Sequence, residues 1–222
     1  MMGSVAAALA EAWETGQPVA PLAAEHALGG LEAAEAVAGA VLLKLAVAPC
    51  GIRVTEGGLV GAMLPGRIVA SGLPLPIAAL PHGRAAPALL VVLAEAVTED
   101  GTGLPAVARL HPALDIATSR WRDGPANPFE AAADLAGLGH VVIGRGKPAA
   151  WPASCAMGTE RARPAAVAAL FAQAVAVARE AGGLPEGAVL VLVFDSRAMP
   201  VTEVSEWAAR WTGLGKVQVS LR

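Results

Sequence analysis

The spacing of apolar residues along the chain changes near residue 50. Before it, two alanine-rich stretches, residues 4–14 and 31–46, predict helices, and a proline-punctuated connector separates them. After it, short apolar runs alternate with Gly/Pro turns, which is typical of strands. One later stretch, residues 164–180, returns to helical spacing and begins with a proline suited to a first helical turn. We therefore expect helices at the N-terminus, strands after them and one long inserted helix.

The strongest strand candidates are five apolar runs in the second part of the chain: residues 88–97, 110–118, 140–144, 188–194 and 217–221. The last run alternates apolar and polar residues, so one of its faces should meet solvent. The order shows no strict strand–helix alternation, which disfavours a Rossmann sheet or a TIM barrel. The pattern favours an α+β fold with a mixed, barrel-like β-sheet. We expect an N-terminal helical segment, residues 1–48, and a mixed-β domain, residues 49–222.

Composition restricts the partners that this chain can have. Of its 222 residues, 55% are hydrophobic and 16% are charged, against about 25% charged residues in typical soluble domains. Part of the apolar surface is therefore expected to be buried in a homo-oligomer or against another subunit. The net charge is −3 and no basic cluster occurs, so neither nucleic acid nor a membrane is expected as a partner. No Lys or Arg precedes Lys44, so no secretory signal is expected and the predicted location is cytoplasmic.

A dense group of polar residues stands in the apolar sequence HPALDIATSR, residues 111–120. Asp115 lies inside a predicted buried strand, and a Thr-Ser-Arg triplet ending at Arg120 follows it. A buried acid needs an arginine, backbone amides or a metal ion as a partner. Asp115 and Arg120 could neutralise each other across a turn, or Asp115 could belong to a functional site. Phosphate-binding loops, nucleophile elbows and zinc-type Cys/His spacings do not occur in the sequence.

This segment, followed by the run at residues 140–144, resembles the 2-keto-4-pentenoate hydratase group of the fumarylacetoacetate hydrolase-like superfamily. The pattern of that family is roughly HPALEIVDSR before a strand that ends in glycine. CGIRV (50–54), MLPGRIVASGLPLP (63–76) and WTGLGKVQVSLR (211–222) are similar to further family segments and occur in the same order. The resemblance covers nearly the whole chain.

The resemblance implies a mixed β-barrel-like core and a divalent metal, Mg²⁺ or Mn²⁺, held by three carboxylates. Such a metal would polarise the keto group of a 2-oxo acid while a lysine and further acids move protons. The family carries two of the carboxylates in a Glu-Pro-Glu motif, but here alanines, Ala86 and Ala88, flank the proline. Asp115 occupies the only remaining ligand position, and Arg53 stands where the family has its lysine.

These departures predict a degenerate metal site. We expect no cofactor, with Mg²⁺ or Mn²⁺ bound only if another acid, such as Asp195, rebuilds the site. At the catalytic positions that the resemblance implies, the chain carries Arg53 and Asp134. The expected contacts to a carboxylate ligand come from Arg53, Ser119 and Arg120, because arginine can bind a carboxylate through two parallel hydrogen bonds.

The sequence leaves three functions open. A hydratase-like protein without catalysis, acting as a partner subunit or carboxylate-binding protein, fits the loss of both glutamates and the lysine. An active hydratase or lyase that acts on a small 2-oxo acid fits the resemblance. A metal-free enzyme could use Arg53, Asp115, Cys50 and a histidine, since a cysteine near an arginine can have a lowered pKa. A small carboxylate or 2-oxo acid is the expected ligand in each case.

Overall fold

The structure is a computed structural model that describes residues 2–23, 27–148, 151–152, 154–157, 160–162 and 164–222. Its helices are α1 (Met2–Thr15), α2 (Leu31–Leu45), α3 (Pro128–Ala133) and α4 (Pro164–Glu180). Its strands are β1 (Gly51–Thr55), β2 (Val60–Met63), β3 (Ile68–Ala70), β4 (Arg84–Leu93), β5 (Val107–Ala117), β6 (His140–Ile143), β7 (Cys155–Met157), β8 (Glu160–Ala162), β9 (Val189–Val193), β10 (Met199–Pro200), β11 (Ser205–Trp211) and β12 (Gly215–Leu221).

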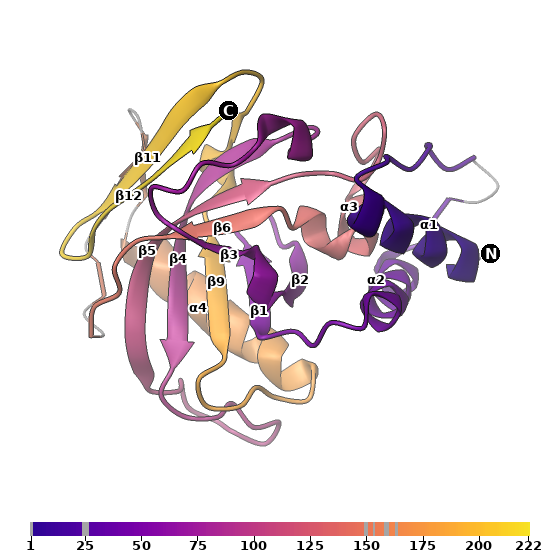
Figure 1. The fold of residues 1–222 in the computed structure, drawn as a ribbon. Coiled ribbons are helices and arrows are strands. Elements are labelled where there is room, and N and C mark those ends of the chain that lie inside the picture. The colour runs from indigo at the N-terminus through magenta and orange to yellow at the C-terminus, as the bar shows by residue number, and fades with distance from the viewer. Residues whose placement is uncertain (1, 24–26, 149–150, 153, 158–159, 163) are drawn as a thin grey trace.

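The strands form two sheets. The larger has the order β2-β1-β9-β4-β5-β6-β3, and β10 pairs with β4 outside this path. It is mixed, because β1 runs parallel to β9 whereas β4 runs antiparallel to both β9 and β5. The smaller sheet has the order β12-β11-β7-β8, and its long hairpin of β11 and β12 lies over β5 (Figure 1). The predicted α+β fold with a mixed, barrel-like sheet is confirmed.

The two faces of the larger sheet pack into two hydrophobic clusters, because side chains alternate along each strand. On one face, Leu89 and Leu192 pack with α4 and with the β11–β12 hairpin. On the other face, Ala88 and Val191 pack with α1, α2 and α3. Figure 1 shows α4 behind the strands and the helices α1 and α2 together at the right of the view. The polar side chains of interest lie on the second face, which we call the helix-covered face.

Most elements that the hydrophobic pattern predicted are present. The helices at residues 4–14, 31–46 and 164–180 are α1, α2 and α4, and the last of these has the predicted bounds. The strand expected at residues 88–97 instead begins at Arg84 and ends at Leu93, because its first residues pair with the end of β5. The pattern therefore located this strand but not its start.

Helix α3 was not predicted, although its start carries a recognisable signal. Asn127 precedes Pro128, and its side-chain oxygen accepts a hydrogen bond from the backbone N–H of Glu130 at 2.9 Å. A capping asparagine before a first-turn proline is a standard helix start. The helix has only 6 residues, too few for a hydrophobic period to stand out.

No helix in the described part of the chain is long and apolar enough to cross a membrane.

Candidate functional site

Arg53 and Asp115 form a buried, two-point ion pair on the helix-covered face. Nε of Arg53 donates to Oδ1 of Asp115 at 2.7 Å, and Nη2 donates to Oδ2 at 2.6 Å. Arg53 is 2% exposed and Asp115 is 1% exposed. Nη1 of Arg53 also donates to the backbone carbonyl of Ala136 at 2.8 Å. The guanidinium is therefore fixed on three sides, and each carboxylate oxygen accepts one of its hydrogen bonds.

The two residues meet because small side chains lie between them. Strands β9 and β4 separate β1 from β5 in the sheet order. Ala86 is the direct partner of Asp115 across β4 and β5, and Ala88 is the partner of Val193 across β4 and β9. Ala86 and Ala88 share one face of β4, because residues two apart on a strand point to the same side. These alanines leave the space through which the long Arg53 side chain reaches Asp115.

The electrostatics of this pair favour a permanently charged arginine. Burial by itself would lower the pKa of Arg53, but the charge and hydrogen bonds of Asp115, with a contribution from Asp195, outweigh it and raise that pKa. An arginine does not release its proton at ordinary pH. Arg53 can therefore hold a negative or polar group but cannot serve as the proton-transferring base that a lysine could be.

Cys50 does not have the lowered pKa that a metal-free enzyme using its thiolate would need. Burial raises the pKa of the Cys50 thiol, although its own backbone hydrogen bond opposes the shift. Its Sγ donates to the carbonyl of Met63 at 3.4 Å. Cys50 and Cys155 are both free, and one is half-buried and the other buried, so the sequence-based interpretation of two small packed residues is confirmed.

A cavity of about 270 Å³ lies over the ion pair, and we call it the carboxylate cavity. Its walls come from β1, β4, the end of β5 and the segments around residues 82, 136 and 195. The polar side chains that line it are Arg53, Thr55, His82, Arg84, Asp115, Thr118, Ser119 and Asp195. A space of this volume holds several water molecules. A small organic acid has a comparable size.

Arg120 and Asp134 form a second buried pair, separate from the first. Oδ2 of Asp134 accepts a hydrogen bond from the backbone N–H of Arg120 at 2.8 Å, and Oδ1 lies 3.4 Å from Nη1 of Arg120. Burial raises the pKa of Asp134 to about 6 in spite of the nearby guanidinium. The alternative in which Asp115 and Arg120 neutralise each other is wrong, because each has a different partner.

The structure thus divides the residues that the sequence singled out. Arg53, Asp115 and Ser119 line the carboxylate cavity together, and Asp195 reaches it as the sequence suggested. Arg120 lines a different cavity on the other side of the Thr118–Arg120 segment. Asp134 lies with Arg120 rather than beside Arg53.

Two cavity residues were missed in the sequence, His82 and Arg84. Arg84 could have been found, because it stands two residues before Ala86 and must share its face once the strand is extended to its true start. His82 carries no such signal, since it lies in a turn with a positive φ of 53°. Nε2 of His82 lies 2.9 Å from the carbonyl of Arg122.

The side chains at the expected metal position do not fit a divalent cation. Hard cations such as Mg²⁺ need several oxygen ligands, whereas Ala86 and Ala88 carry none and Arg53 occupies both oxygens of Asp115. Asp195 is held at the cavity wall by the backbone N–H of Gly57, at 2.9 Å. The described residues contain no group of three His, Cys, Asp or Glu side chains that could hold a metal ion.

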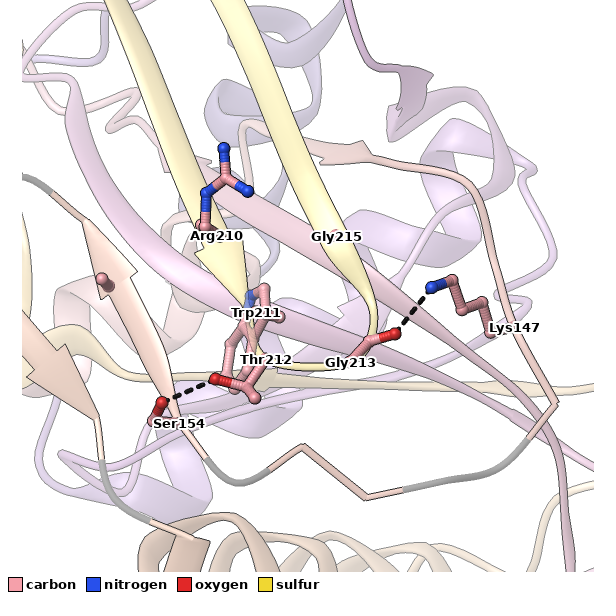
Figure 2. Close-up of a pocket in the computed structure, with 8 residues that line it drawn as sticks. Lys147, Ser154, Arg210, Trp211, Thr212, Gly213 and Gly215 are labelled. Atoms are coloured by element: carbon pink, nitrogen blue, oxygen red, sulfur yellow. Dashed lines mark hydrogen bonds between the residues drawn. The ribbon is translucent and has the colours of Figure 1, made fainter.

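A larger concavity of about 580 Å³ lies at the turn between β11 and β12, and Figure 2 shows its polar groups bonded mainly to one another. Nζ of Lys147 donates to the carbonyl of Gly213 at 2.7 Å, and the hydroxyls of Ser154 and Thr212 are 2.8 Å apart. Arg210 is exposed on β11. This surface gathers no buried charge, so the carboxylate cavity is the stronger candidate site.

His140 gives the fold a predictable dependence on pH. Burial, Arg67 and Arg120 lower its pKa to about 4, against about 6.5 in an unfolded chain. A base with a lowered folded pKa supplies stability above pH 6.5 and loses it as the pH falls towards 4. On acidification, we expect the free energy of unfolding of His140→Gln to fall by about 1–2 kcal/mol less than that of the wild type, allowing for solvent screening.

Thermal unfolding of the wild type and of His140→Gln between pH 7 and pH 4.5 measures this effect. Asp134, whose raised pKa acts in the opposite direction over the same range, is present in both proteins and cancels in the comparison. Parallel curves for the two proteins would contradict the prediction.

Comparison with known proteins identifies the fold. No protein-family model and no curated protein matches the chain. The solved structure of 4-oxalocrotonate decarboxylase from Pseudomonas putida G7, complexed with magnesium and adipate, is 15% identical, has a TM-score of 0.80, and covers 100% of this chain and 97% of its own.

Two further structures cover less of the chain. Fumarylpyruvate hydrolase from Pseudomonas aeruginosa, in complex with Mn²⁺ and pyruvate, is 17% identical with a TM-score of 0.57, and covers 75% of this chain and 79% of its own. 2-Hydroxyhepta-2,4-diene-1,7-dioate isomerase from Mycobacterium marinum is 12% identical with a TM-score of 0.58, and covers 79% and 75%. The chain therefore has the fumarylacetoacetate hydrolase-like fold, in a divergent form, as the sequence resemblance predicted.

Proposed function

We propose that this protein is a metal-independent binding protein for a small carboxylate of the 2-oxo acid class, with the ligand held in the carboxylate cavity. The observation that carries the proposal is the two-point pairing of Arg53 with Asp115 beside Ala86 and Ala88. A guanidinium provides the fixed positive charge at the position where the resemblance implies a metal. It cannot act as a Lewis acid, and it gives up no proton.

The donors of the cavity suit an acid that carries an additional oxygen. A guanidinium has five N–H groups, and the contacts of Arg53 with Asp115 and Ala136 use only three of them. Arg84 is exposed at the cavity wall, donates to the carbonyl of Ala198 at 3.1 Å, and has no carboxylate partner among the described residues. We assign the ligand's carboxylate to Arg84 and its keto or hydroxyl oxygen to the free N–H groups of Arg53.

The names of similar structures support this class of ligand. Three of these structures were solved with adipate, with acetate and with pyruvate, each together with a metal ion. We propose this class of ligand for this chain without a metal, because the side chains described above do not fit a divalent cation. Because the same proteins are a decarboxylase and a hydrolase, an active lyase or hydrolase is the alternative function that the test must address.

Titration of EDTA-treated protein with pyruvate, oxalate and adipate tests the proposal. We expect at least one acid to bind without metal, and Arg84→Gln to weaken that binding about tenfold or more, because it removes a charge-assisted hydrogen bond. Arg109→Gln is the matched control, since Arg109 is exposed at the far end of β5. Its affinity should equal that of the wild type.

Three outcomes would overturn the proposal. Binding that requires added Mg²⁺ or Mn²⁺ would return the chain to metal-dependent chemistry. Turnover of the bound acid in EDTA would identify a metal-free enzyme. If none of the three acids binds, small carboxylates are excluded as ligands of this cavity.

A further inference from the structure

A second cavity, of about 140 Å³, lies on the other side of the segment Thr118–Arg120. Its walls come from four separate parts of the chain: the end of α1 with Trp13, the turn with Arg67 before β3, the segment 78–81, and the segment with Arg120 after β5. Gln17 and Ser119 add polar groups to the same walls. The proposed carboxylate site uses neither Arg67 nor Arg120.

Two guanidinium groups converge on one indole ring in this cavity. The guanidinium carbon of Arg120 lies 3.5 Å from the ring centroid of Trp13, and that of Arg67 lies 4.6 Å from it. A cation over an aromatic face gains some stabilisation, but two like charges held against the same ring also repel each other. A negative charge between the two guanidinium groups would offset this repulsion.

The described residues supply only part of that negative charge. Asp134 pairs with Arg120 at 3.4 Å, whereas Arg67 is half-buried and makes no ion pair or side-chain hydrogen bond among them. The neighbouring ring of His140 is no counter-charge, and its buried Nδ1 has no hydrogen-bond partner in the described part of the chain. Burial lowers the pKa of Arg67. Burial, with repulsion from Arg67, also lowers the pKa of Arg120 to about 10. The cavity therefore has one positive charge in excess.

We propose that this cavity binds a phosphate-class oxyanion between Arg67 and Arg120, with Trp13 as its apolar wall. The cavity, of about 140 Å³, has room for several waters, and an inorganic phosphate has only five heavy atoms. A tetrahedral phosphate presents three or four oxygens in different directions and carries more charge, so it suits two guanidinium groups on different walls better than a planar carboxylate with two oxygens. The bound group is either free phosphate or the phosphate of a small monoester.

Calorimetric titration of the full chain with inorganic phosphate, methyl phosphate and acetate tests this site. We expect phosphate to bind and acetate to bind at least about tenfold more weakly. Binding of methyl phosphate as tight as that of phosphate indicates a monoester ligand, and weaker binding indicates free phosphate. Arg67→Gln should weaken phosphate binding about tenfold or more, since it removes one charge-assisted partner, and Arg67→Lys should weaken it less because the charge remains. Arg109→Gln is the matched control with unchanged binding.

Folding of the variants is checked by thermal unfolding without ligand. Arg67→Gln should unfold at the wild-type temperature or above it, because loss of the repulsion with Arg120 offsets loss of the contact with Trp13. Phosphate should raise the unfolding temperature of the wild type and of Arg67→Lys more than that of Arg67→Gln. Equal binding of phosphate and acetate, or an Arg67→Gln variant that binds phosphate as the wild type does, would overturn the proposal.

Discussion

Asp115→Leu is expected to lower the free energy of unfolding by about 3–5 kcal/mol, the cost of removing one partner from a buried ion pair. The physical reason is that Arg53 would remain buried and charged with no counter-charge at hydrogen-bonding distance. Its pKa is held up by Asp115, so that support is lost with the carboxylate. Urea unfolding, followed by tryptophan fluorescence, measures the change.

The matched control is the double variant Arg53→Met, Asp115→Leu. Replacing both members of a buried pair with apolar residues of similar volume is often neutral or stabilising. We therefore expect the double variant to recover most of the loss seen in Asp115→Leu. A cost below about 1 kcal/mol for Asp115→Leu would contradict a buried, structurally important pair, and so would a double variant at least as unstable as Asp115→Leu.

The second large effect is a gain of metal binding. The triple variant Arg53→Lys, Ala86→Glu, Ala88→Glu is expected to bind Mn²⁺ with micromolar affinity, because it supplies two carboxylates and releases the third, Asp115, from the guanidinium. All three carboxylates then face one point on the helix-covered face, through the pairing of Ala86 with Asp115. Oxygen ligands of this kind are what a hard cation needs. Calorimetry, together with loss of the Mn²⁺ signal in electron spin resonance, measures the affinity.

Arg53→Lys alone is the control for this gain. It has the family's lysine but only one carboxylate, so it should not bind Mn²⁺. Tight binding by this single variant would mean that Ala86 and Ala88 are not the reason for the missing site. Failure of the triple variant to bind while it remains folded would contradict the placement of the three positions around one point.

The hydrophobic pattern predicted the elements that carry a long period or a continuous apolar run. Helix α4 is an example of the first kind, since its apolar face packs against one cluster, and strand β9 of the second, since its residues are buried alternately in both clusters. The pattern did not predict the short strands β7 and β8 or the helix α3, because segments this short cannot show a hydrophobic period. The start of β4 was missed for a different reason, since Arg84 and its neighbours belong to the strand through pairing with β5 rather than through their own propensity.

For the site, the sequence predicted that Asp115 needs a partner but not which one. A buried acid in an apolar run needs a partner for its charge. The choice of Arg53, which stands 62 positions earlier, depends on the sheet order and on the small side chains between the two strands. The nearer Arg120 was an equally good partner on sequence alone, and only the fold sends it to Asp134.

The most direct test of the account is calorimetric titration of EDTA-stripped wild-type protein with Mn²⁺, in the absence and in the presence of oxalate. Oxalate mimics the chelating end of a 2-oxo acid and would tighten any metal site of this kind. Because Arg53 occupies both oxygens of Asp115, we predict no heat of Mn²⁺ binding in either titration. Micromolar Mn²⁺ binding that tightens with oxalate would contradict the account and would restore metal-dependent chemistry on 2-oxo acids as the function.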